Sequence, residues 1–106
     1  MYRPLPSYLT IKSSNIHELG LFALENIAIG TNMGMSHMKI KDTIFRTPLG
    51  GFINHANEAN CVKAEMRMTE EDTKGHKYDY QKWNLITSRD VKKGEELTVR
   101  YTFYNV

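Results

Sequence analysis

The stretch GGFINHANEANC, from Gly50 to Cys61, is the most unusual part of this sequence. Two glycines and two apolar residues lead into a group of asparagines around one histidine. Strands are poor in asparagine, and a turn rarely needs so many polar groups after an apolar lead-in. The pattern therefore indicates that Asn54 and His55 hold a specific polar group.

The flanking sequence contains an internal similarity. LFALENIAIGTNMGM (21–35) and LITSRDVKKGEELTV (85–99) align without gaps, and each reads as strand, turn, glycine and strand. The glycine is expected to supply a positive φ before the second strand. Two copies are too few for a repeat array, so the pattern predicts a β-rich fold built from two similar corners. The matched pairs are Leu21 and Leu85, Ile27 and Val91, Gly30 and Gly94, Met33 and Leu97, and Met35 and Val99.

Period-two alternation predicts further strands. It begins at Cys61 and continues to Met68, and a second strand is expected over KWNLIT (82–87). The polar segment TEEDTKGHKYDYQ (69–81) between them is predicted to be the solvated loop of a long hairpin. In the closing segment ELTVRYTFYNV (96–106), alternate residues form one apolar face, which includes Tyr101.

Composition limits the class of protein. The 106 residues fit one domain, and a net charge of +2 with scattered lysines predicts no direct contact with nucleic acid. Cys61 is the single cysteine, so it is expected to be a small buried apolar residue in an intracellular protein, with no internal disulfide. No apolar run reaches the roughly 20 residues that a membrane helix needs. The methionines of NMGMSHM (32–38) are expected to pack in the core, and the sequence predicts no metal site.

Three segments, in this order, resemble the signature of SET-domain protein lysine methyltransferases. ELGLFA (18–23) is similar to the family's glycine motif, G-x-G, and FINHANEANC (52–61) to its R-F-[IV]-N-H-S-C-x-P-N-C segment. GEELTVRYTFY (94–104) resembles the closing G-E-E-L-x-x-D-Y element. The resemblance spans residues 8–104, nearly the whole chain.

The resemblance implies a mainly β fold, the β-clip, with short strands, little helix and a knot-like threading of the C-terminal segment. Residues 1–106 would form a single minimal SET domain of the viral kind, without the zinc modules that flank larger members. If the source is viral, the protein is expected in the cytoplasm or nucleus of the host cell. Because the sequence printed here ends five residues after Tyr101, a second subunit is expected to complete the site, which predicts a homodimer.

The resemblance also implies an S-adenosylmethionine-dependent protein-lysine N-methyltransferase, acting on a histone or another lysine-bearing protein or peptide. Lysine has a pKa near 10.4, so attack on the methyl group requires deprotonation, which desolvation and a nearby cation favour. An apolar channel would desolvate the amine, and alignment of the reacting atoms would supply most of the gain. The implied roles are cofactor binding for Leu19, Gly20, Asn54 and His55, catalysis for Tyr101, and a substrate lysine channel for Val99, Phe103 and Tyr104.

Several positions depart from the family pattern. Glu18 stands in place of the first glycine of the motif, Ala59 in place of a proline, and Arg100 in place of an aspartate. Glu18 and the short C-terminal segment favour a second hypothesis, a degenerate member that keeps the fold as a binding or interaction module. His55 taken alone is more typical of a hydrogen-bonded structural histidine than of a ligand contact, and Tyr101 taken alone is more typical of a structural residue than of a catalytic one.

Overall fold

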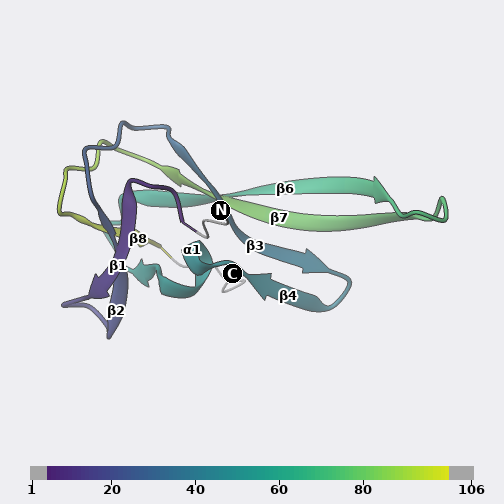
Figure 1. The fold of residues 1–106 in the computed structure, drawn as a ribbon, viewed down its shortest axis with the longest axis horizontal. Coiled ribbons are helices and arrows are strands. Elements are labelled where there is room, and N and C mark those ends of the chain that lie inside the picture. Colours follow the sequence, from purple (N-terminus) through teal and green to yellow (C-terminus); the bar gives the residue numbers. More distant parts are fainter. Residues whose placement is uncertain (1–4, 101–106) are drawn as a thin grey trace.

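The computed structural model describes residues 5–100 and consists of β-strands with one short helix (Figure 1). The sheet order is β1-β2-β8-β6-β7-β3-β4, and β5 pairs with β8 outside this path. The mainly β prediction with little helix is confirmed. The elements are β1 (Leu9–Ser13), β2 (Leu19–Ala23), β3 (Asn32–Ile40), β4 (Thr43–Arg46), α1 (Pro48–Phe52), β5 (Asn54–His55), β6 (Cys61–Glu71), β7 (Lys77–Thr87) and β8 (Glu96–Val99).

The two similar segments pair with each other. Ile27 and Val91, which occupy matched positions, form an isolated antiparallel bridge. The Ile27 N–H donates to the Val91 carbonyl at 2.7 Å, and the Val91 N–H donates back at 2.8 Å. The strands beside the two turns also pair between the copies. Leu21 of the first copy lies opposite Leu97 of the second, and Leu85 of the second lies opposite Gly34 of the first.

Side chains repeat this relationship on both sides of the bridge. Asp90 Oδ1 accepts from the Ile29 N–H at 2.8 Å, and the matched Asn26 Oδ1 accepts from the Lys93 N–H at 2.9 Å. Both turns also use the expected left-handed glycine, with φ of +82° at residue 30 and +90° at residue 94. The two corners are therefore related by a local two-fold axis through the Ile27–Val91 bridge.

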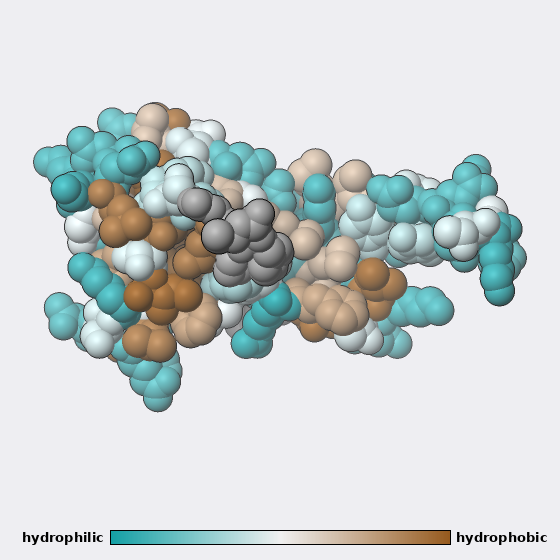
Figure 2. All heavy atoms as spheres, viewed as in Figure 1, coloured by the Kyte–Doolittle hydropathy of each residue, from teal (hydrophilic) through white to brown (hydrophobic). Residues whose placement is uncertain are grey.

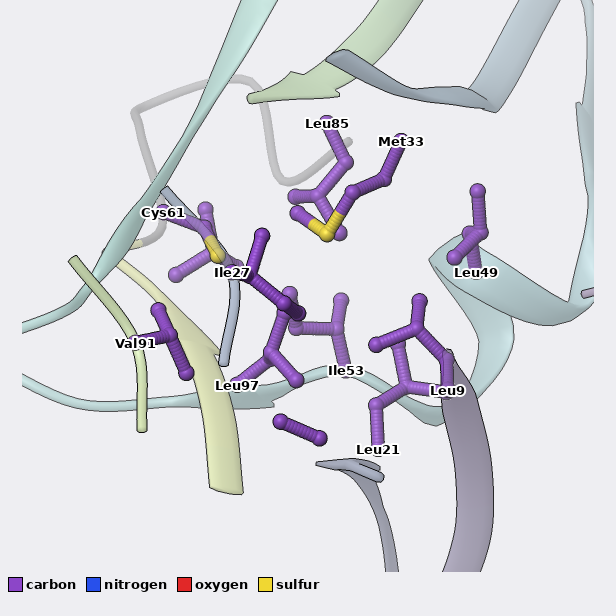
Figure 3. Packing of buried hydrophobic residues seen from close by; sticks show 12 residues of the cluster. Leu9, Leu21, Ile27, Met33, Leu49, Ile53, Cys61, Leu85, Val91 and Leu97 are labelled. Carbon is purple, nitrogen blue, oxygen red and sulfur yellow. The ribbon is translucent and has the colours of Figure 1, made fainter. Parts of the chain in front are cut away.

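The core gathers around these corners (Figure 3). Leu21, Leu85 and Leu97 are completely buried, and Ile27 and Val91 pack in the same cluster. Cys61 lies at its edge, where burial raises the pKa of the thiol to about 12, as expected for a small apolar residue. Both copies of the repeated pattern thus supply the centre of one core.

A long two-stranded arm projects from this core, formed by β6 and β7 (Figure 1). Its tip is hydrophilic (Figure 2). The predicted hairpin is confirmed, but the predicted loop over 69–81 is too long, because the strands pair as far as Glu71 with Lys77. Asp72 closes the short turn: its Oδ1 accepts from the N–H groups of Lys74 and His76, each at 2.9 Å.

The first glycine of GGFINH allows α1 to lie directly on β3. A Cβ atom at Gly50 would overlap the Ser36 carbonyl oxygen and the ring of His37. The chain then leaves the helix at Ile53 and enters β5, which runs parallel to β8 through the pairs Asn54–Thr98 and His55–Val99. The Asn-His segment is thereby held against the last described strand.

The knot-like threading stays a prediction, because it concerns the chain after Arg100 and residues 101–106 lie outside the described part. Within residues 5–100, no helix has the length and apolar character needed to cross a membrane.

Candidate active site

Asn54 lies at the centre of a group of oxygen atoms. Its Nδ2 is 2.8 Å from Glu96 Oε2, 3.1 Å from the Leu19 carbonyl, and 3.2 Å from both the His17 carbonyl and Ser14 Oγ. Four acceptors around one end of an amide require that end to be the NH2 group. We call Ser14, Asn54, Glu96 and the carbonyls of His17 and Leu19 the clasp.

Ser14 connects the clasp to the turn between β1 and β2. Its hydroxyl donates to Glu96 Oε1 at 2.6 Å, and its oxygen accepts from the Ile16 N–H at 2.9 Å. The turn closes through the Ser14 N–H, which donates to the Glu18 carbonyl at 2.9 Å. A serine beside a turn commonly satisfies local main-chain donors in this way. The side chain of Ser14 thus fixes both the turn and the carboxylate.

The glycine motif forms one wall of the clasp. A Cβ atom at Gly20 would overlap Glu96 Oε2 and approach Asn54 Nδ2 to 3.1 Å, so only glycine fits there without displacing the carboxylate. The neighbouring Glu18 has a φ of +37°, a left-handed conformation that suits glycine far better than glutamate. The backbone at this position is therefore one that glycine, the residue of the family motif, adopts more easily than glutamate.

Two other predicted cofactor residues lie beside this wall. Leu19 is 44% exposed and gives its carbonyl to the clasp, while its side chain faces outward. His55 is exposed and follows Asn54 directly on β5. The structure therefore brings Leu19, Gly20, Asn54 and His55 to one region, although they come from two distant segments of the sequence.

The predicted lysine channel is only partly within the described residues. Val99 is 1% exposed and belongs to the hydrophobic core, where it pairs with His55 and Cys61. Its place in a substrate channel stays a prediction. Tyr101, Phe103 and Tyr104 lie outside the described residues, and so do the surroundings of the predicted catalytic hydroxyl of Tyr101.

The sequence model of the SET domain family matches residues 35–102, which is more than half of the chain. The chain belongs to the SET domain family. The matched region includes Asn54, His55 and Tyr101 and begins after the glycine motif. The structure places the glycine motif beside Asn54. A search of curated protein sequences gave no match.

Solved structures share the fold of this SET domain, and 114 of their chains match it. One is the crystal structure of a Plasmodium falciparum protein provisionally assigned as a histone methyltransferase. That match has a TM-score of 0.65 and 13% sequence identity, and it covers 92% of this chain and 96% of the other. At this identity the likeness shows the fold alone, and the predicted β-clip SET fold is confirmed.

Another asparagine of the SET motif has a structural role. Asn60 is almost fully buried, and its Nδ2 donates to the Glu96 carbonyl at 2.9 Å. Its Oδ1 accepts from the Thr98 N–H at 2.8 Å. Asn60 therefore fixes the main chain of β8, so the amides of the motif do not all face a ligand.

Sequence reasoning missed Ser14 and Glu96. Glu96 was visible only as the second acid of G-E-E-L on the polar face of its strand, and nothing local marks Ser14. The pairing of β2 with β8 is what brings Glu96 to the site. Phe22 lies opposite Glu96, so the Glu96 carboxylate lies near the glycine turn. Within residues 5–100, no group of three or more histidines, cysteines and acids could hold a metal ion.

Proposed function

We propose that this SET domain is an S-adenosylmethionine-dependent protein-lysine N-methyltransferase. The observation that carries the proposal is the clasp, which joins the Asn-His motif to the glycine turn through Asn54 and Glu96. A β-clip needs a turn between β1 and β2, but it does not need an asparagine that reaches across 35 residues of sequence to the Leu19 carbonyl.

The chemistry of the residues fits a zwitterionic ligand. Main-chain carbonyls and a carboxylate are groups that accept hydrogen bonds from an ammonium group. The NH2 end of the Asn54 amide faces the clasp, so its Oδ1 points to the other side and is an acceptor there. The exposed His55 and the exposed apolar side chain of Leu19 lie beside this site on its solvent side. Leu19, Gly20, Asn54 and His55 would hold the cofactor.

S-adenosylmethionine, when bound, supplies a methyl group on a positively charged sulfur. The chain has to present the target lysine as a neutral amine and to align it. Apolar surroundings lower the pKa of a lysine because they disfavour its charged form. In the proposal Val99, Phe103 and Tyr104 provide those surroundings, and Tyr101 orients the amine through its hydroxyl. The substrate is a lysine in a histone or in another protein.

Cofactor binding tests the proposal most directly. Calorimetric titration with S-adenosylmethionine is expected to show micromolar binding, and Asn54→Ala should weaken it about tenfold or more because it removes buried hydrogen bonds. Asn57→Ala is a matched control, since Asn57 is exposed in the turn that follows β5 and is not part of the clasp. Equal affinities for the two variants would contradict the assignment of Asn54.

The role of Tyr101 requires a kinetic test. Tyr101→Phe should keep cofactor affinity and lower methyl transfer to a lysine peptide by about a hundredfold or more, the range typical of a positioned catalytic hydroxyl. Unchanged turnover in this variant would exclude that role.

One observation favours a second function, a SET-fold binding module without activity. Glu18 keeps a left-handed backbone where the family motif has glycine, and it adds an exposed carboxylate to the turn that precedes Leu19 and Gly20. A well-folded protein that binds no S-adenosylmethionine, in both the wild type and Glu18→Gly, would support this alternative over the enzyme.

A further inference from the structure

The four strands β4, β3, β7 and β6 are neighbours in the sheet, and one of their faces carries a line of cations (Figure 1). Residues directly opposite on neighbouring antiparallel strands share a face. The register therefore places Lys39, Gln81 and Arg67 in one row. The next row of the same face, towards the base of the arm, carries Arg46, and Lys63 follows one row further. We use the name cationic stripe for these cations together with the one in the turn after β3: Lys39, Lys41, Arg46, Lys63 and Arg67.

This face carries an excess of positive charge. From the row of Lys63 to the row that pairs Asp79 with Thr69, the strands place four cations and two acids on it. The whole chain has a net charge of +2, so this one face has as much excess positive charge as the complete protein. Such a concentration of charge favours an anionic partner.

The two acids of this face already have partners. Glu65 Oε1 accepts from Gln81 Nε2 at 2.8 Å and lies 3.6 Å from Arg67 Nε. Asp79 Oδ1 accepts from the Thr69 hydroxyl at 2.8 Å. Within residues 5–100, three cations of the stripe form no ion pair: Lys39, Lys41 and Arg46.

Part of the stripe borders an open cavity of about 450 Å³. Lys39, Lys41 and Arg67 give it three cations, and Asp79 gives it one acid, whereas Asp42 in the same turn as Lys41 does not border it. Lys41 has a φ of +54°, a left-handed conformation that glycine adopts more easily. The backbone of the turn therefore gives no reason for a lysine there.

Positive charge is also crowded at the base of the stripe. Burial, Lys63 and Arg46 lower the pKa of His37 to about 4. Burial and Arg46 also lower the pKa of Lys63. These cations thus act on one another through space, and an anion bound beside them would relieve the repulsion.

An extended peptide with acids at alternate positions matches the spacing of the stripe. Side chains on one face of a strand repeat about every 6–7 Å, and so do alternate side chains of an extended peptide. Lys63, Arg46 and Lys39 lie in three successive rows. Nucleic acid suits this face less well, because its closely spaced phosphates would also meet the carboxylates of Glu65 and Asp79.

We infer that the cationic stripe binds an extended acidic segment of a partner protein. Carboxylates at alternate positions of that segment pair with successive cations of the stripe. Met68 and Tyr80, which also border the cavity, contact the methylene groups of the acidic side chains. The inference is independent of methyl transfer, since no residue of the stripe belongs to the clasp and the binding needs no cofactor.

Lys39 and Lys82 provide a matched test. Lys82 pairs with Met38 and Met66, so it lies on the opposite face, and replacing either lysine by glutamate changes the net charge equally. Binding is measured by fluorescence anisotropy at about 50 mM salt with a labelled peptide of alternating glutamate and threonine. We expect a dissociation constant of about 0.1 mM or lower, raised about tenfold by Lys39→Glu and at most about threefold by Lys82→Glu. If Lys39→Glu unfolds, as circular dichroism would reveal, Arg67→Glu at an exposed position takes its place.

Lys41→Gly separates binding from folding. It should raise the melting temperature, because glycine suits the left-handed backbone, and it should weaken peptide binding by about threefold or more, because the cavity loses a cation. Full affinity for the peptide in this variant would contradict the role of the cavity.

The choice of ligand tests the chemistry of the partner. A peptide with glutamine in place of glutamate should not bind, and one with its glutamates in a single block should bind about threefold or more weakly. An oligodeoxynucleotide of equal charge should also bind more weakly than the alternating peptide. A dissociation constant above about 1 mM for that peptide, equal effects of Lys39→Glu and Lys82→Glu, or tighter binding of the oligonucleotide would each overturn the inference.

Discussion

The side-chain nitrogen of Asn54 lies 2.8 Å from Glu96 Oε2, a contact that links the Asn-His segment to the first residue of β8. Ser14 holds the other oxygen of the same carboxylate at 2.6 Å, so one glutamate joins three segments of the chain. The amide is a donor at this point, and every neighbouring group is an acceptor. The clasp therefore depends on the chemical identity of Asn54 as well as on its shape.

Replacing the amide by a carboxylate should disrupt the clasp. Asn54→Asp keeps the size of the side chain but sets a negative oxygen against Glu96 and the Leu19 carbonyl, and we expect a loss of about 2–3 kcal/mol in the free energy of unfolding at pH 7. Adding Glu96→Gln restores a donor and should recover part of this loss. Urea unfolding of both single variants and the double variant measures the coupling, and additive effects would mean that the two side chains do not interact.

Glu18→Gly should stabilise the protein. A left-handed conformation costs a residue with a Cβ about 1–2 kcal/mol, and the extra freedom of glycine in the unfolded chain offsets part of the gain. We expect a net gain of about 0.5–1 kcal/mol in thermal or urea unfolding. Glu18→Ala is the control, because it removes the same carboxylate but retains the Cβ. A gain as large in the alanine variant would assign the effect to charge and not to the backbone.

The two adjacent glycines of α1 should respond in opposite ways to alanine. Gly50→Ala places a Cβ against the Ser36 carbonyl and the His37 ring, and we expect a loss of about 2 kcal/mol or more. No atom lies within 4 Å of the corresponding position at Gly51, so Gly51→Ala should be neutral or stabilise by up to about 1 kcal/mol. Melting temperatures compare the two, and similar losses would exclude close packing of α1 as the cause.

His37 should make stability depend on pH. Burial, together with the cations Lys63 and Arg46, lowers the pKa of His37 to about 4 from its usual 6.5. Between these two values the unfolded chain binds a proton that the folded chain does not, so stability falls as the pH drops from 6.5 towards 4. The full contribution is of the order of 3 kcal/mol. Urea unfolding of the wild type and His37→Gln at several pH values measures it, and an unchanged pH dependence in the variant would contradict this source.

Much of the fold was predictable because its signals are local. Strand alternation and the glycines at positions 30 and 94 depend on residues within about 15 positions of one another, and each has a direct conformational cause. The internal similarity compares two such windows of 15 residues. The order of the SET motifs identified the family and placed Asn54 in the candidate site. The length of the arm was underestimated because charged, polar residues are common both in loops and on exposed strands.

The sequence by itself thus determined the β class, the two corners and the motif residues. Only the tertiary structure decided that the corners bridge each other at Ile27 and Val91 and that Ser14 and Glu96 complete the clasp. The reason is that these relationships depend on strand register between distant segments. Ser14 and Glu96 are 82 residues apart, and one step of register would turn the Glu96 side chain to the other face of β8, away from Ser14.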